Sequence, residues 1–311
     1  GTVLVPGRLD NPRAVAIRGD GAILVADAGA PAEPTSGRVV EIGSHGTVMS
    51  LLGDIANATG SDAESGQAHL HGLSDLAVDG NALYIVLGEE AWVGSPLLGP
   101  NRLIRRDSSG DVAPIFDIGF FEQEYDPDRA GPESNGTGVA VTPDGMFWVT
   151  DAAGNWAAYL AADGTVEATV TFPNVDGEDA VPTGVAVGPD GSAYVALFHC
   201  RSPTAGKGGV ARVAANGRSE IVVANLNLPI DVAFDQSGNM YVLEFAVDYA
   251  PRSGRVLRVP GQDPPVILID GLNFPTSLAI DAAGRFYVTE IVSPAGGKAG
   301  TGRLLRFDPT G

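Results

Sequence analysis

The chain has 311 residues, 44% of them hydrophobic, with 42 glycines and 22 prolines spread along its length, which indicates a folded core with many turns. Its formal net charge of −19 argues against nucleic-acid binding, because phosphate contacts need clusters of lysine and arginine. The sequence has no run of about 18 apolar residues that would span a membrane, and its single cysteine, Cys200, excludes an intrachain disulfide.

Six copies of one unit follow one another, each with two short apolar runs joined by a tight turn. The copies are residues 11–28, 74–89, 136–152, 182–198, 229–245 and 275–291. Their aligned alanines are Ala16, Ala77, Ala140, Ala186, Ala233 and Ala279, with separations of 61, 63, 46, 47 and 46 residues. Because the turns are of the Asp-Gly or Ser-Gly type, the pattern predicts six β-hairpins in a repeat architecture.

A second pair of apolar runs follows the hairpin, most clearly at residues 37–52, 101–116, 209–224 and 254–269. Four strands in each of six units predict an all-β, six-bladed β-propeller, with four antiparallel strands per blade and a single domain over residues 1–311. The last unit ends after its third strand, at 303–307, and residues 2–8 resemble the missing fourth. We therefore expect the N-terminal strand to close the last blade and remove its open edge.

Loop lengths distinguish the two faces of such a propeller. Turns within the first and second halves of each blade are short, as in "TPDG" and "ADG". Connections between the halves, and between blades, are long at residues 28–37, 54–70, 88–100, 117–134, 199–208 and 291–302. Long loops on one face of a rigid scaffold favour a binding face; random variation of surface loops is the alternative. We call this side the long-loop face.

Four blades carry an acidic residue at the end of the second strand: Asp27, Asp151, Glu244 and Glu290. Three of the third strands that follow begin with an arginine: Arg38, Arg255 and Arg303. Neighbouring antiparallel strands bring such residues together, so we expect three structural acid–arginine pairs in preference to a cation site. Asp151 is predicted to be the freest of the four acids, because Trp156 opens the next strand.

Two further acids, Asp75 and Asp231, occupy the same aligned position in the second and fifth blades, on opposite sides of a six-fold ring. A buried carboxylate needs a hydrogen-bond donor or a cation. Two interpretations therefore stay open: backbone amides and channel water satisfy both acids, or the acids hold Ca²⁺ or Mg²⁺ near the axis.

Three of the four histidines, His69, His71 and His199, belong to long-loop segments, whereas His45 lies in a short turn. No H-E-x-x-H motif accompanies them, so the sequence disfavours zinc. The candidate ligand-binding residues are Asp75, Asp151, Asp231, His71 and His199, with Tyr125 from the 117–134 insertion as a lid. No motif assigns a catalytic residue.

The repeated pattern P-x-G-V-A-V-x-P-D-G-x-x-Y-V-x-D, followed by Gly-Arg and an apolar residue, resembles the NHL repeat. The segment AVPTGVAVGPDGSAYV at 180–195 is similar to the fourth blade of the ScyD/ScyE family. The blade order and the insertion FFEQEYDPDRAGPESNGTGVAV at 120–141 resemble the ScyD/ScyE family of bacterial secreted propellers. That resemblance implies a propeller fold, an extracellular or periplasmic location and a link to assembly of the pigment scytonemin. It assigns no catalytic residues.

Two functions of different class fit these patterns. The favoured one is a binding or assembly protein that takes a small molecule or a protein partner on its long-loop face. The alternative is a lyase or hydrolase with a divalent cation on the axis, because YVTEIVSPAGGKAGTGRLLRF at 287–307 resembles blades of the virginiamycin lyase type. Those enzymes use a histidine beside the metal, and no motif places one here.

Overall fold

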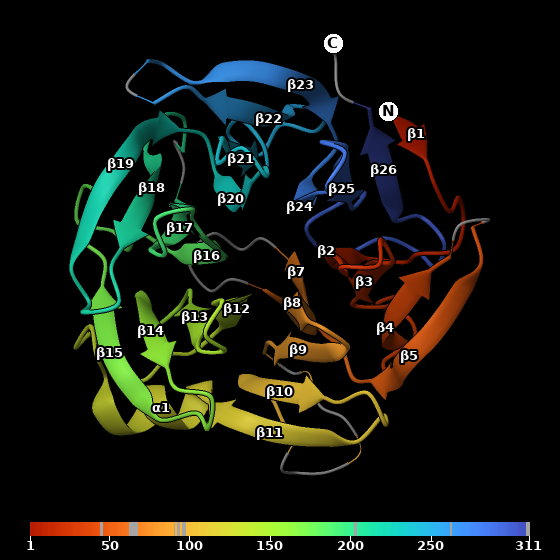
Figure 1. Cartoon of the computed structure of the whole chain (residues 1–311), viewed down its shortest axis with the longest axis horizontal. Coiled ribbons are helices and arrows are strands. Elements are labelled where there is room, and N and C mark those ends of the chain that lie inside the picture. The colour runs from red at the N-terminus through yellow and green to blue at the C-terminus, as the bar shows by residue number, and fades with distance from the viewer. Residues whose placement is uncertain are drawn as a thin grey trace. The chain divides into compact units, whose positions relative to one another are not determined.

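The computed structural model describes residues 1–43, 46–61, 68–89, 91, 94, 98–201, 204–261 and 263–308, without the side chains of residues 61, 68 and 69. The chain folds as an all-β, six-bladed propeller of four-stranded antiparallel sheets (Figure 1). It divides into two compact units, residues 1–114 with 274–311, and residues 115–273.

The first unit holds the first, second and sixth blades. The first blade is β2 (Pro12–Ile17), β3 (Ile23–Asp27), β4 (Gly37–Ile42) and β5 (Val48–Ile55). The second is β8 (Leu73–Asp79), β9 (Ala82–Leu87), β10 (Arg102–Arg106) and β11 (Val112–Asp117), whose end passes into the second unit. The sixth is β24 (Pro275–Ile280), β25 (Phe286–Glu290), β26 (Arg303–Phe307) and β1 (Thr2–Val3). Within this unit β2 packs against both β8 and β24.

The second unit holds the third, fourth and fifth blades. The third is β12 (Gly136–Val141), β13 (Phe147–Asp151), β14 (Trp156–Leu160) and β15 (Val166–Thr171). The fourth is β16 (Pro182–Val187), β17 (Ala193–Leu197), β18 (Gly208–Val213) and β19 (Ser219–Leu226). The fifth is β20 (Pro229–Phe234), β21 (Met240–Glu244), β22 (Gly254–Val259) and β23 (Val266–Leu272). Here β16 packs against both β12 and β20.

Apolar and β-branched residues of the second and third strands build the core, because both faces of these strands meet other blades. Ile85 in β9 and Ile104 in β10 are fully buried in a cluster that joins the first and second blades. Ala211 in β18 and Trp148 in β13 belong to a matching cluster between the third and fourth blades. Burial of a large apolar side chain contributes about 1.5–3 kcal/mol, so these clusters hold adjacent blades together.

The N-terminal strand closes the sixth blade, as the sequence predicts. In β1, Thr2 lies opposite Arg306 and Val3 opposite Leu305, antiparallel to β26. The Leu4 amide extends the ladder by donating to the Leu304 carbonyl at 3.0 Å. The sheet order β1-β26-β25-β24 therefore gives the last blade its fourth strand from the start of the chain.

Two segments that the sequence analysis treats as loops contain secondary structure. The segment 54–70 overlaps a small hairpin of β6 (Ala58–Ser61) and β7 (Ala68–His71), which ends one residue beyond it. The 117–134 insertion begins with helix α1 (Ile118–Tyr125), whose N-cap Asp117 accepts a hydrogen bond from the Phe120 amide at 2.9 Å. Among the described residues, no helix has the length and apolar character needed to cross a bilayer.

Candidate functional site

The three predicted acid–arginine pairs are present, each across the second and third strands of one blade. Asp27 lies opposite Arg38, Glu244 opposite Arg255, and Glu290 opposite Arg303. The carboxylate–guanidinium distances are 3.2, 2.5 and 2.5 Å in the same order. All three acids are buried, so the arginines neutralise charges that would otherwise be costly. These acids are structural, as predicted.

Asp151 has no arginine opposite it, as predicted; its register partner in β14 is Trp156. It is not free, however. Its Oδ1 accepts from the amides of Asn135 at 2.7 Å and Gly154 at 3.0 Å, and its Oδ2 accepts from the Ser134 hydroxyl at 2.5 Å. Burial raises the pKa of Asp151, and these hydrogen bonds oppose that rise. The prediction that Asp151 is the freest acid is wrong, because loop residues supply the donors that an arginine supplies elsewhere.

His199 lies at the start of the loop that follows β17 and is buried, with 1% of its surface exposed. The backbone holds it there: the His199 amide donates to the Ala180 carbonyl at 3.0 Å. Its Nε2 is 3.4 Å from Oε2 of Glu178 without the alignment of a hydrogen bond. Among the described residues, no well-aligned hydrogen bond reaches either ring nitrogen of His199 or Oε2 of Glu178. This pair, a buried imidazole beside a partly exposed glutamate, is an incompletely bonded polar site.

Charge and burial keep the imidazole of this pair neutral. Burial and the charge of Lys207 lower the pKa of His199, while Glu178 and Asp176 oppose that shift. Lys207 forms an ion pair with Asp176 at 3.2 Å, and a guanidinium nitrogen of Arg201 is 4.0 Å from Oε1 of Glu178. A neutral imidazole offers one donor and one acceptor, and the carboxylate beside it offers acceptors only.

Aromatic side chains of the fifth blade fix the loop that carries His199. Phe198 packs edge-to-face against Phe245, with ring centroids 5.8 Å apart, and against Tyr249 at 6.4 Å. The Tyr249 hydroxyl donates to the carbonyl of Cys200 at 2.9 Å. Two adjacent blades therefore hold this part of the long-loop face in position.

The remaining predicted site residues occupy separate places. In the first unit, Nδ1 of His71 lies 2.7 Å from Oε2 of Glu89, and Asp75 is half-buried in β8 opposite Val86. In the second unit, Asp231 is half-buried in β20, and its Oδ1 accepts from the Val232 amide at 2.8 Å. Tyr125 ends α1 with 65% of its surface exposed. Their shared role as ligand contacts stays a prediction, as does the axial metal of Asp75 and Asp231.

The other two histidines and a hollow in the first unit do not contribute to the described site. His45 lies outside the described residues, as does the side chain of His69. In the first unit a polar hollow of about 400 Å³ is lined by Gly7, Arg8, Asp10, Arg38, Val48, Ala299 and Gly300. None of the predicted site residues lines it, so it adds nothing to the candidate site.

Sequence reasoning missed two acidic residues of the second unit. Glu178 meets His199 from the connection between β15 and β16, which the sequence analysis did not include among the long loops. Glu122 lies in the insertion, where its i, i+4 spacing from buried Ile118 could have indicated a helix with a buried face. No local signal shows that Glu122 meets Trp156, which comes 34 residues later.

The chain matches no protein-family model, and no curated protein matches it in sequence. Solved structures that resemble it include a virginiamycin B lyase from Staphylococcus aureus, with 10% identity, coverage of 96% of this chain and 85% of that one, and a TM-score of 0.56. A streptogramin B lyase has 11% identity, coverage of 100% and 87%, and a TM-score of 0.60. A gluconolactonase from Xanthomonas campestris has 15% identity, coverage of 98% and 88%, and a TM-score of 0.58. Identities this low show the propeller fold alone.

Proposed function

We propose that the protein is a binding propeller of the ScyD/ScyE type, which takes a hydroxyl-bearing small molecule or the corresponding group of a partner beside His199 and Glu178. The observation that carries this proposal is that the two buried ring nitrogens of His199 and one buried oxygen of the partly exposed Glu178 have no well-aligned hydrogen bond within the described residues. A buried polar atom without a partner costs about 1–3 kcal/mol. A ligand that forms hydrogen bonds with these atoms offsets this cost when it binds.

The ligand class follows from the donors and acceptors of the pair. A hydroxyl group can donate to Oε2 of Glu178 and accept from the N–H of His199 at the same time. A carboxylate or phosphate ligand would be repelled by Glu178, since Arg201 is only loosely associated with it. Phenols and sugar hydroxyls therefore fit better than anions. We also expect the protein outside the cytoplasm, from the resemblance to ScyD/ScyE, and fractionation of producing cells would test that location.

The test is an NMR titration of the full chain with phenol, tyramine and D-glucose as probes. We expect at least one probe to shift the ring ¹⁵N resonances of His199, and the shift to disappear in a Glu178→Gln variant. Glu167→Gln, which alters an exposed glutamate of β15 in the same unit, serves as the control and should leave the titration unchanged. His199 resonances that respond to none of the three probes would contradict the proposal.

The second candidate is a metal-dependent lyase or hydrolase. It is favoured by the neutral imidazole beside a carboxylate, an arrangement suited to general acid–base catalysis. The solved lyases and the gluconolactonase named above have the same fold. On this hypothesis Asp75 and Asp231 hold the divalent cation, so Asp75→Asn with Asp231→Asn should abolish metal-dependent thermal stabilisation, while Asp144→Asn should not. His199→Ala should then abolish any turnover of gluconolactone or of a streptogramin B.

A further inference from the structure

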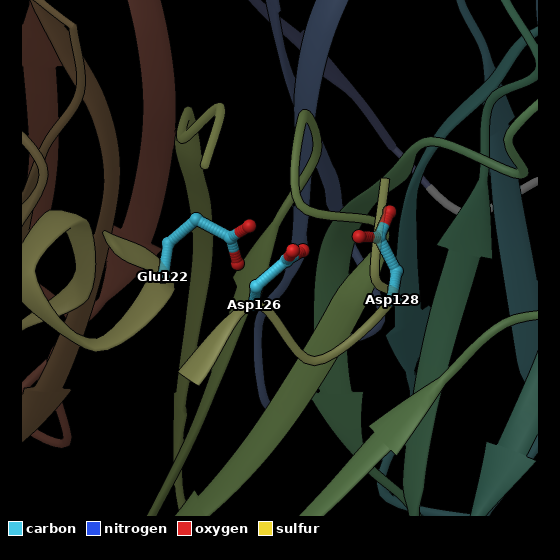
Figure 2. Close-up of side chains that lie close together, drawn as sticks. All are labelled: Glu122, Asp126 and Asp128. Carbon is cyan, nitrogen blue, oxygen red and sulfur yellow. The ribbon is translucent and has the colours of Figure 1, made fainter. Parts of the chain in front are cut away.

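Three carboxylates converge where α1 ends and the insertion continues towards β12. Glu122 lies in the last turn of the helix, Asp126 caps its C-terminus, and Asp128 follows in the loop. One oxygen from each lies within 4.8 Å of the other two. Figure 2 shows the three carboxylates pointing towards one another.

Glu122 is the buried member of this group, and it is incompletely bonded. Its side chain has no exposed surface. Oε2 accepts from the indole nitrogen of Trp156 at 2.6 Å, whereas Oε1 is buried and no residue that the structure describes donates a hydrogen bond to it. A carboxylate taken out of water needs either donors for its oxygens or a cation beside it. Within the described structure, Oε1 is therefore removed from water without a hydrogen-bond donor or a cation to replace it.

No positive side chain within the described ranges supplies that partner. Across the described part of the chain, no lysine, arginine or histidine forms an ion pair with Glu122, Asp126 or Asp128. The three carboxylates therefore lie together without a positive side chain paired to them in the described structure.

The two aspartates already have backbone donors that hold them in place. Asp126 Oδ1 accepts from the Gly131 amide at 3.2 Å, and Asp128 Oδ1 accepts from the Ala130 amide at 2.9 Å. Each of these backbone bonds uses only one oxygen of its carboxylate. The loop therefore presents preoriented acceptors around the unbonded oxygen of Glu122.

We propose that Glu122, Asp126 and Asp128 bind one Ca²⁺ ion, with water completing its coordination. Calcium–oxygen distances of about 2.3–2.6 Å allow two ligands of one ion to lie up to roughly 5 Å apart, which matches the span of this cluster. Oxygen-only ligands suit a hard cation. An irregular set from a helix end and a loop suits Ca²⁺ better than Mg²⁺, which demands near-ideal octahedral geometry.

The ion would fasten the insertion to the third blade. Glu122 links it to Trp156 of β14, and Asp126 and Asp128 link it to the loop that leads into β12. This site is independent of the pair His199 and Glu178 and of the axial residues Asp75 and Asp231. Either of the functions proposed above can fail while this site stands.

The first test is isothermal titration calorimetry of the metal-stripped full chain with CaCl₂. We expect binding with a dissociation constant between about 10⁻⁶ and 10⁻³ M, and weaker binding of Mg²⁺. The double variant Asp126→Asn/Asp128→Asn keeps an amide oxygen for each backbone donor but loses two charges, so we expect affinity to fall at least tenfold. Asp163→Asn is the matched control: it alters an exposed aspartate that accepts from the Thr165 amide at 3.0 Å, and it should leave binding unchanged.

A second test locates the ion, because Trp156 lies beside Glu122. Tb³⁺ in a calcium site emits when a nearby indole is excited, so the wild type should show sensitised emission that Ca²⁺ displaces. Trp156→Phe should remove most of this emission, and Asp126→Asn/Asp128→Asn should remove it by preventing binding. Emission that persists in Trp156→Phe would place the ion elsewhere. No Ca²⁺ binding by the wild type, equal affinity for Mg²⁺, or wild-type affinity in the double variant would overturn the proposal.

Discussion

The third and fifth blades each have a buried acid at the end of the second strand, but the acid has different partners in the two blades. In the fifth, Glu244 at the end of β21 meets Arg255 at 2.5 Å, and the two charges cancel. In the third, Asp151 at the end of β13 lies opposite Trp156, which carries no charge. Asp151 takes its hydrogen bonds from the loop, and the Trp156 indole donates to Glu122 instead.

This difference shows how one substitution in a repeat changes the electrostatics of a region. The register of the two strands is the same in both blades, with the acid opposite the first or second residue of the third strand. Replacing arginine by tryptophan removes a positive charge and adds a donor that a second carboxylate can use. Two buried acids then share one neighbourhood without a cation from the chain. The departure from the repeat, rather than the repeat itself, marks the region where a ligand is to be sought.

The largest effect is expected from Arg255→Ala, which leaves Glu244 buried without its counter-charge. Removal of one partner of a buried pair costs about 3–5 kcal/mol, and we expect the lower end because Arg255 is partly exposed. Urea unfolding would measure the loss. Arg258→Ala on the same strand is the control, because Arg258 is exposed and bonds only the amide oxygen of Asn239 among the described residues. Equal losses in both variants would show that the pair does not neutralise a buried charge.

Trp156→Phe should have the next largest effect, because it leaves both oxygens of Glu122 without a donor. An unsatisfied buried acceptor costs about 1–3 kcal/mol. The same substitution in a Glu122→Gln background should cost less, since no charge then remains to be solvated. The two losses compared by urea unfolding form a double-mutant cycle. A coupling energy near zero would contradict the importance of the indole–carboxylate bond.

Glu122 should make stability depend on pH in calcium-free buffer. Its pKa is about 7 in the folded chain and near 4.5 in the unfolded chain, so the folded state binds the extra proton between these values. Stability from this group is therefore full below about pH 4.5 and is lost as pH rises through 7. Wild type should lose about 1–2 kcal/mol relative to Glu122→Gln between pH 5 and 8. Parallel pH profiles of the two proteins in thermal unfolding would disprove this assignment.

Asp151→Asn should have the smallest effect, within about 1 kcal/mol. Asparagine keeps one oxygen for the amides of Asn135 and Gly154, and its nitrogen can donate to the Ser134 hydroxyl. Loss of the charge also relieves repulsion of Glu122, whose pKa should fall. Chemical denaturation measures the first effect, and NMR titration of the Glu122 carboxylate measures the second. A large destabilisation would mean that the loop donors require a full negative charge.

The fold could be predicted well from the sequence because the same pattern of strands and turns occurs in all six blades. Glycine turns, apolar runs and the acid–arginine positions recur, and each copy supports the assignment of the others. The closure by β1 followed from counting strands. Helix α1 and the β6–β7 hairpin were missed because each occurs once, inside an insertion, with no second copy to compare.

The candidate site was predictable only in part, for a physical reason. The sequence identified Asp151 because no arginine is placed opposite it. Its hydrogen bonds, however, come from Ser134 and Asn135 in the preceding loop. His199 was identified from its place in a long loop, whereas Glu178, its neighbour, comes from a different connection. Contacts between two loops depend on the path that each loop's backbone takes. Those paths differ from blade to blade, so the repeated sequence pattern does not predict them.

Gly154 offers a way to recognise related chains. A Cβ built at this position would lie 2.6 Å from Oε2 of Glu122 and 2.5 Å from the Trp156 indole nitrogen, so any larger residue would displace both. Its amide also bonds Asp151. The spacing D-x-x-G-N-W at 151–156, with a glutamate in a short helix upstream, is therefore a compact fingerprint. Homologues that have lost the glutamate should tolerate alanine at this glycine, and such linked changes would trace the history of the insertion through evolution.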